Sequence, residues 1–312
     1  MKRKQSGFKI MMRLIKLVKP LAFFMVLAVI LGVTGFLCAI QITVVGSMTL
    51  LTAAGINGGL AIKTGCICII IFAVLRGFLH YGEQACNHYI AFKLLAIIRD
   101  KVFKSLRRLT PAKLEGKDKG NLISLITSDI ELLEVFYAHT ISPICIAFLT
   151  SLVMLIFIGR YSIWLMLVAL AAYITVGIII PLVSSKFNKN IGMTYRENSG
   201  SLSGYVLDSM RGLLESIRYN STDTRLNEMN EKTDELNSLQ KKLKKIEGHN
   251  ISITDISIIF FSITMLLVAI CLYQKGTIGF DGLIVSTVAM MSSFGPVAAL
   301  SNLAGNLTHT LA

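Results

Sequence analysis

The sequence predicts an all-α membrane protein with six transmembrane helices and two long helical hairpins that project from the membrane. Three observations support this fold class. Of the 312 residues, 54% are hydrophobic and only 16% are charged, whereas soluble domains carry about 25% charged residues. The apolar residues are concentrated in blocks long enough to cross a bilayer. Two long polar stretches, 89–139 and 184–250, separate these blocks and keep a helical pattern.

Six apolar segments follow one another along the chain, and each is expected to span the membrane. Residues 1–20 precede them, are rich in Lys and Arg, and show no cleavage site of the kind that ends a signal peptide. We therefore expect a cytosolic N-terminal segment at 1–20 and one transmembrane domain at 21–312. The expected spans are residues 21–51, 66–88, 140–159, 162–183, 251–273 and 283–303.

The stretch from Gly65 to Leu109 links the membrane to the first hairpin. It begins apolar and turns basic without losing its helical pattern, until the Thr-Pro pair at 110–111 interrupts it. A helix of about 45 residues would be roughly 65–70 Å long, and the bilayer core takes about 30 Å of that length. The remainder must project into the aqueous phase. The second hairpin repeats this design, with a break at 211–220 and a charged helical run at 222–245.

Positive charge is distributed unevenly along the chain. Of the 31 Lys and Arg residues, only Lys63, Arg160 and Lys275 fall in the three short loops expected outside the cell, and Arg76 lies in the second span. The others lie in the N-terminal segment and the two hairpins, as the positive-inside rule requires of cytosolic segments. The net charge of +13 therefore indicates a multi-pass topology with both termini in the cytosol, and it does not indicate a nucleic acid partner.

Six polar residues gather on two adjacent faces of the second span. Ionisable groups are costly at membrane depth, so we expect them to face the protein interior and to line a substrate pathway. Two alternatives are a structural polar network between helices and a position at the level of the lipid headgroups. At helical spacing, the residues are Arg76, His80, Glu83 and Asn87 on one face and Gln84 and His88 on the next.

The first hairpin reads GNLISLITSDI from Gly120 to Ile130. Together with six spans and two long hairpins, this segment resembles the transmembrane domain of a type 1 ABC exporter, although that family usually has an acidic residue and an arginine at the positions of Asn121 and Leu125. The resemblance implies that the hairpin tips dock onto ATP-hydrolysing domains. The coupling residues would then be Glu115, Lys117, Gly120 and Asn121 in the first hairpin and Gly212, Glu215, Arg218 and Tyr219 in the second.

A narrower resemblance is carried by HYGEQACNH from His80 to His88, by LTPAKL around Pro111, and by ISP at 141–143. These segments are similar to exporters of the CydC/CydD type, which are linked to cysteine, glutathione and haem. That subfamily has arginines at the positions of His80 and Gln84. The resemblance implies a small thiol such as cysteine or glutathione as cargo, and His88 as a candidate haem ligand. A lipid, a peptide or a drug is the alternative cargo.

The 312 residues contain no G-x-x-x-x-G-K-[ST] loop, the signature that cradles nucleotide phosphates. The chain alone is therefore not expected to be an enzyme. The resemblance implies that ATP and Mg²⁺ bind a nucleotide-binding domain on a continuation of this chain or on a separate chain. It also implies a second half-transporter, expected as a heterodimer partner, in a bacterial plasma membrane. A secondary transporter without an ATP-driven motor is the less favoured alternative, because such proteins do not need long hairpins.

Overall fold

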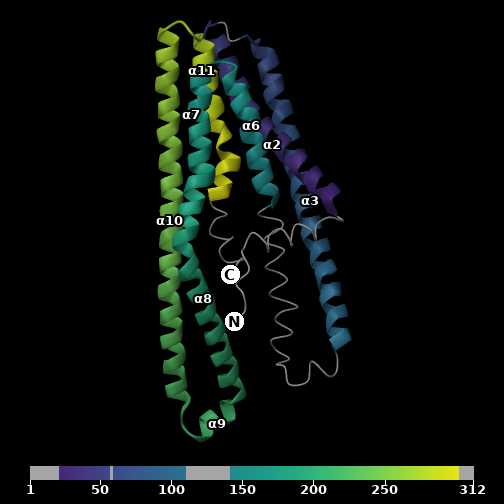
Figure 1. Ribbon diagram of the computed structural model, residues 1–312, viewed down its shortest axis with the longest axis vertical. Helices are drawn as coiled ribbons and strands as arrows, with labels where there is room; N and C mark the ends of the chain where they lie inside the picture. The colour runs from purple at the N-terminus through teal and green to yellow at the C-terminus, as the bar shows by residue number, and fades with distance from the viewer. Residues whose placement is uncertain (1–20, 57–58, 110–140, 302–312) are drawn as a thin grey trace.

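The chain folds as a bundle of long helices. The computed structural model describes residues 21–56, 59–109 and 141–301, and every regular element within these ranges is helical. Figure 1 shows the helices running along one long axis, with a very short helix at one end, called here the strut end. The opposite end, with the short loops, is the loop end. In chain order the elements are α2 (Ala22–Ala53), α3 (Ile62–Leu109), α6 (Ser142–Gly159), α7 (Ile163–Ile174), η3 (Thr175–Ile179), α8 (Ile180–Arg211), α9 (Leu213–Arg218), α10 (Thr222–Gln274) and α11 (Phe280–Ser293).

Six helical segments are long and apolar enough to cross a membrane, which confirms the predicted fold class. The second helix begins at Ile62, four residues before the expected start of its span, and the sixth begins at Phe280 instead of Leu283. The six segments are Ala22–Ala53, Ile62–Arg108, Ser142–Gly159, Ile163–Ser185, Thr222–Gln274 and Phe280–Ser301.

Two helices are much longer than a bilayer requires. α3 has 48 residues and α10 has 53, which correspond to about 72 Å and 80 Å, against about 30 Å for the bilayer core. α3 passes from an apolar to a charged sequence and α10 from a charged to an apolar one, in both cases without a break in the helix. The continuous helix predicted from Gly65 to Leu109 is therefore present. The return arm that the sequence predicts for the first hairpin falls in 110–140 and lies outside the described residues.

The second hairpin is described in full: α8 leads to α9 at the tip, and α10 returns beside α8 (Figure 1). Polar side chains join its two arms through hydrogen bonds. A cation–π contact also joins them, with Lys232 Nζ 5.6 Å from the centre of the Tyr205 ring. The hydrogen bond from Tyr205 to the Glu228 carboxylate raises the pKa of this half-buried tyrosine. Three interhelical hydrogen bonds are Asn198 Nδ2 to Glu235 Oε1 at 3.0 Å, Tyr205 Oη to Glu228 Oε2 at 2.7 Å, and Arg225 Nη1 to Ser209 Oγ at 3.2 Å.

A single π-helical turn, η3, joins α7 to α8, and Pro181 follows it at the start of α8. Proline has no backbone N–H and its ring collides with the carbonyl four residues earlier, so the wider turn just before it accommodates both defects. Gly177 within this turn lies against the last part of the sixth segment, because a Cβ at 177 would come within 2.9 Å of Val297 Cγ1. The helix can therefore pass the proline and continue to Arg211 as one arm of the hairpin.

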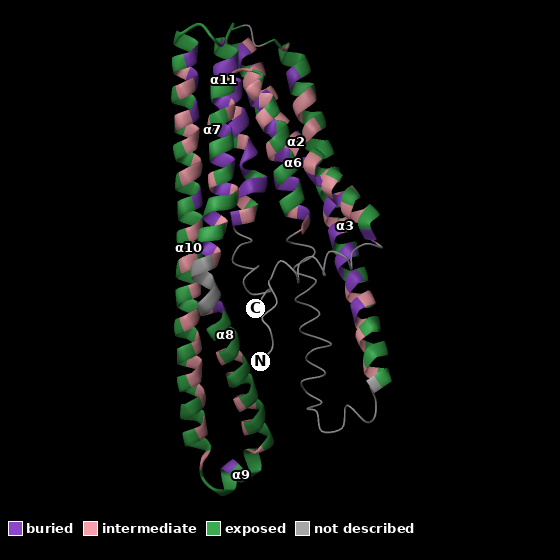
Figure 2. Ribbon diagram, in the orientation of Figure 1, coloured by how far each residue is buried: buried purple, intermediate pink, exposed green. Residues whose placement is uncertain are grey.

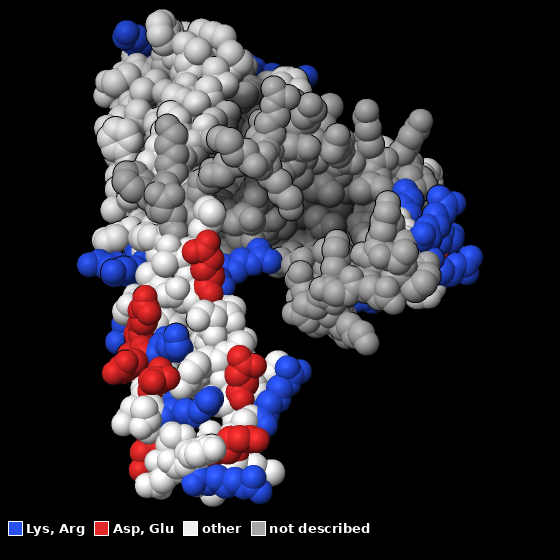
Figure 3. All heavy atoms as spheres, turned by 60° about the horizontal axis from the view of Figure 1, so that its bottom comes forward, with Lys and Arg blue, Asp and Glu red and all other residues white. Residues whose placement is uncertain are grey.

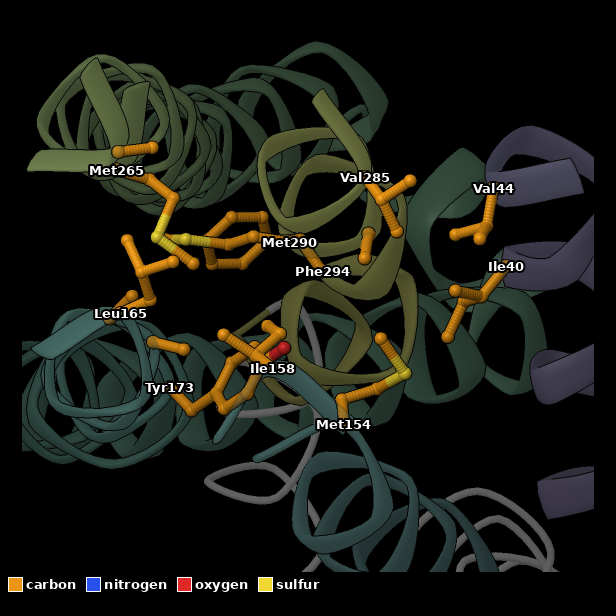
Figure 4. Packing of buried hydrophobic residues seen from close by; sticks show 14 of the residues in the cluster. Ile40, Val44, Met154, Ile158, Leu165, Tyr173, Met265, Val285, Met290 and Phe294 are labelled. Carbon is orange, nitrogen blue, oxygen red and sulfur yellow. The ribbon is translucent and has the colours of Figure 1, made fainter. Parts of the chain in front are cut away.

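The main hydrophobic core lies between α7, α10 and α11, with contributions from α2 and α6. Figure 4 shows side chains from these helices meeting at its centre, where Leu165, Met265 and Met290 are fully buried. The Tyr173 hydroxyl is hydrogen bonded to Ser293, and its ring packs edge-on against Phe294 with centroids 5.9 Å apart. By contrast, the outward faces are green and pink in Figure 2 and carry many exposed apolar side chains, as expected for surfaces in contact with lipid.

Leu165→Ala should destabilise the protein by about 2–5 kcal/mol, because it leaves a cavity in the core that neighbouring side chains fill only in part. Leu165 is fully buried, whereas Leu167 on the same helix is 44% exposed. Leu167→Ala is therefore the matched control and should change stability much less. The measurement is the thermal midpoint of each variant in detergent. Equal shifts for the two variants would contradict the assigned inward face of α7.

Candidate functional site

A polar cluster lies on α3 where this helix packs against α2. Glu83 and Asn87 are buried, with 6% and 5% of their surface exposed. His80 Nδ1 lies 3.2 Å from Glu83 Oε2, and the His80 side chain is itself 61% exposed. Of the two basic residues on the same helix face, Arg76 and His80, it is His80 that pairs with Glu83. Among the described residues there is no ion pair between Arg76 and Glu83.

The two helices approach closely because α2 presents glycine at the contact. A Cβ on Gly32 would collide with the Ile146 side chain of α6 and would lie 3.2 Å from the Glu83 Cδ atom. Only a residue without a side chain fits between these groups, in the manner of small residues at helix contacts in membranes. Gly32 therefore fixes where the Glu83 carboxylate sits between α2, α3 and α6.

Contacts along the antiparallel pair α2 and α3 give the depth of this cluster. Phe24, near the start of α2, packs on Tyr89 with ring centroids 4.6 Å apart, and Gly32 lies opposite Glu83. Along the bundle axis, Glu83 thus lies at the same height as Gly32, which is ten residues or about 15 Å from the start of α2. Because α2 is uncharged over its whole length, the Glu83–His80 pair lies at the level of an apolar span and not beyond its end.

The other residues of the predicted face are less enclosed. Arg76 is exposed, and Gln84 is half-buried. His88 is exposed as well and stacks on Phe92, with ring centroids 6.1 Å apart. Of the six residues predicted to line a pathway, the structure therefore gathers three next to α2, and we call His80, Glu83 and Asn87 the α3 cluster. Arg76 and His88 lie on open surface of this chain.

The second candidate site is the tip of the hairpin, where α9 spans only six residues. Gly212 precedes it, and the Ser216 side chain folds back to donate a hydrogen bond to the Gly212 carbonyl at 2.8 Å. At the other end of α9, the Ser221 N–H donates a hydrogen bond to the Ser216 carbonyl at 2.9 Å. Asn220 adopts a positive φ of 53°, a conformation that asparagine tolerates better than most residues. The tip is consequently a defined turn built around buried Ser216.

Four large apolar side chains are exposed on α9 and on the residue that follows it, at the tip of a hairpin that carries many charged residues. Glu215 and Arg218, both predicted coupling residues, are exposed beside these apolar side chains. A cluster of exposed apolar residues of this kind marks an interaction surface. We call the following set the α9 patch: Leu213, Leu214, Ile217 and Tyr219, with exposed fractions of 54%, 69%, 60% and 82%.

Charge surrounds the strut end of the molecule. In Figure 3 both signs of charge cover the hairpin formed by α8, α9 and α10, and Lys and Arg collect near the end of α3. The basic residues at the end of α3 include Lys104, Arg107 and Arg108, which are exposed. The four coupling residues predicted in the first hairpin, Glu115, Lys117, Gly120 and Asn121, lie outside the described residues.

Comparison with known proteins agrees with this architecture. The family described as the ABC transporter transmembrane region matches residues 21–297. The match covers all six candidate spans except the last residues of the sixth. The chain therefore belongs to the family of ABC transporter transmembrane regions, and it is a multi-pass membrane protein.

Three relatives show the range of proteins to which the chain is similar. A probable ABC transporter ATP-binding/permease protein of Haemophilus influenzae is 43% identical over 309 residues, which are 99% of this chain and 56% of that protein. The glutathione/L-cysteine transport protein CydC of the same organism is 23% identical over 56% of this chain and 31% of its own length. An ATP-dependent lipid A-core flippase of Shewanella denitrificans is 24% identical over 58% of this chain and 30% of its own length. The chain thus spans about half the length of the first relative, and less of the other two.

Sequence reasoning missed Gly32, although its surroundings carried a signal. Gly32 and Gly35 lie one turn apart in an otherwise bulky span, and a Cβ at 35 would lie 3.5 Å from Leu79 Cβ of α3. Such spacing of small residues in an apolar helix indicates a face where another helix approaches closely. The sequence gives no indication of which helix that is, and the structure identifies α3 and α6 beside Gly32 and α3 beside Gly35.

Gly32→Val should destabilise the protein by about 1–3 kcal/mol, because the new side chain forces α2, α3 and α6 apart. Gly77→Val is the control, since nothing lies within 4 Å of a Cβ at 77, and both substitutions change helix propensity alike. The thermal midpoint in detergent measures the difference. If Gly77→Val were as harmful as Gly32→Val, the close approach at Gly32 would not determine the packing of α2 on α3.

Proposed function

We propose that the chain is the transmembrane half of an ATP-driven exporter and that its ATPase activity comes from a nucleotide-binding domain outside these 312 residues. The observation that carries the proposal is the α9 patch, an apolar docking surface at the end of a hairpin braced by interhelical hydrogen bonds. A channel or a secondary transporter has no need of such a lever. Family membership and the printed names of the relatives, which include ATP-binding/permease proteins, support the same function.

In the proposed topology the strut end is cytosolic, and both termini lie on that side of a bacterial plasma membrane. The concentration of Lys and Arg on the hairpins and the scarcity of positive charge in the loops at the other end support this orientation. ATP and Mg²⁺ would bind the nucleotide-binding domain. A second half-transporter would complete the complex, which we propose to be a heterodimer with each α9 docked on the motor domain of the opposite half.

Closure of the motor domains around ATP would act on the bundle through the α9 patch. Because α9 sits between two braced helices, a push at the tip would tilt the hairpin as one body. α10 carries that tilt directly into a membrane span, since it runs unbroken from Thr222 to Gln274. This chain would thereby convert motion of a soluble motor domain into alternate opening of the membrane bundle.

The proposed cargo is a small polar solute such as cysteine or glutathione, moved past the α3 cluster. Glu83, His80 and Asn87 offer acceptors and donors at the depth of the span, and Arg76 provides a guanidinium that can hold a carboxylate by two hydrogen bonds. His88 is exposed and is the residue that would hold haem iron through its imidazole, where haem would act as regulator or cargo.

A lipid is the second candidate cargo. The flippase relative is about as similar to this chain as the CydC relative, at 24% and 23% identity. A lipid would require an apolar, sideways-open surface, and much of α3 on the loop side of Gly82 exposes apolar side chains such as Ile70 and Phe78. The buried carboxylate of Glu83 favours the polar solute, because a charged group in a path for acyl chains would be costly.

Leu214→Asp should uncouple the transporter from its motor, because a charge on the α9 patch must be desolvated on docking and costs about 2 kcal/mol or more. Leu207→Asp is the control, since Leu207 is exposed on the shaft of α8 and not at the tip. In the assembled transporter, cross-linking from Arg218→Cys to the nucleotide-binding domain should fall roughly tenfold or more in the Leu214 variant only. Capture of the motor domain that is unaffected by Leu214→Asp, or no ATPase in the wild-type complex, would contradict the proposed function.

Glu83→Gln should reduce stimulation of the ATPase by cysteine and glutathione about tenfold. The glutamine amide is uncharged, so it cannot form an ion pair with the ammonium group of the substrate. Asp255→Asn, an exposed acid on α10, is the control and should behave like wild type. Haem titration of wild type against His88→Ala tests the haem ligand separately by its absorption spectrum. Normal stimulation by lipids with none by thiols, in wild type, would overturn the proposed cargo and leave the exporter function intact.

A further inference from the structure

A second polar contact between membrane helices lies near the middle of α10, where its charged part meets its apolar part. Asn250 and Thr254 stand one turn apart on α10, and both contact Ser301 at the far end of the sixth segment. Ser301 is fully buried and Thr254 is 4% exposed. We call these three residues the Ser301 clamp. It is separated along the chain from both the α3 cluster and the α9 patch.

The clamp is a closed circuit of hydrogen bonds. Asn250 Nδ2 donates to the Ser301 carbonyl at 2.9 Å and to Ser301 Oγ at 3.3 Å. Thr254 Oγ1 lies 2.8 Å from Ser301 Oγ and donates to the Asn250 carbonyl at 2.8 Å. The Thr254 proton is thus used within α10, so the Ser301 hydroxyl donates to Thr254. Each hydrogen bond polarises the next and strengthens it, as in other hydrogen-bond networks in a low-dielectric environment.

The position of the clamp indicates a role in transmitting force between helices, and this role rests on the proposed function. From Thr222, beside the α9 tip, to Asn250 is 28 residues of unbroken helix, or about 42 Å. Ser301 is the last described residue of the sixth span. The clamp therefore joins the helix that comes from the α9 tip to the far end of the sixth span.

We infer that the Ser301 clamp locks the end of the sixth span to α10, so that both respond to the motor domain as one rigid body. Phe294 interrupts the regular helix of the sixth segment, so without the clamp the part that ends at Ser301 could move relative to α10. Force arriving at the α9 patch would then be lost at this joint. Asn250, Thr254 and Ser301 are thus positioning residues for coupling, and none of them needs to contact ATP or cargo.

Thr254→Val tests the clamp, because it keeps the shape of the side chain and removes the hydroxyl. Thr254→Ser retains the hydroxyl and should rescue. Thr264→Val is the matched control, since the Thr264 hydroxyl bonds only to the Phe260 carbonyl of its own helix. Ser301→Ala breaks the circuit from the other side and guards against a folding defect in one variant. All four are compared in the assembled transporter, after thermal midpoints confirm that they fold.

Two readouts are taken on each variant: the rate of ATP hydrolysis, and the distance between spin labels on Lys63→Cys and Lys275→Cys with and without ATP and vanadate. Both labelled positions are exposed near the loop end. Thr254→Val and Ser301→Ala should keep ATP hydrolysis within about twofold while reducing the population that changes distance about fivefold or more. Thr254→Ser and Thr264→Val should match wild type.

Three results would overturn the inference. A full distance change in Thr254→Val and Ser301→Ala would show that the clamp transmits nothing. Equal loss in Thr264→Val would show that any hydroxyl on α10 matters equally. No ATP hydrolysis and no distance change in the wild type would remove the proposed function itself, and this outcome differs from the first two because it does not depend on the clamp variants.

Discussion

A backbone inside lipid must satisfy every N–H and C=O group with hydrogen bonds of its own, and the rest of this structure depends on that constraint. The helix is the simplest answer, and once begun it extends at the gain of one hydrogen bond per residue. In α3 and α10 the helix does not end where the apolar residues end. The same helix that satisfies the backbone hydrogen bonds in lipid therefore continues into water as a rigid arm.

Polar side chains hold these rods in register at a few places. Ser301 joins the end of the sixth segment to α10, and Asn198 and Tyr205 bridge α8 to α10. Apolar packing between membrane helices is weakly directional, whereas a hydrogen bond in a low dielectric fixes one register. These contacts thus tie α8 and the end of the sixth segment to α10.

Much of this fold could be predicted from the residues. Long uncharged blocks predicted the six spans, and the break at 211–220 predicted the tip, because Gly212 ends a polar helical run. The partners of side chains that meet across different helices could not be predicted. The Ser301 clamp, for example, joins residues 51 and 47 positions apart. Helical periodicity reports which residues share a face, but the helix that meets that face is set by tertiary packing.

The central claim is that the charged part of α10, from Thr222 to Asn250, is a rigid continuation of the span. Amide hydrogen exchange in the assembled transporter tests it most directly. A rigid lever predicts that amides in 226–250 exchange far more slowly than in a free peptide, with no step in protection where the charged sequence meets the apolar one. Exchange of those amides at the rate of a free peptide, with protection beginning only at Ile251, would contradict the account.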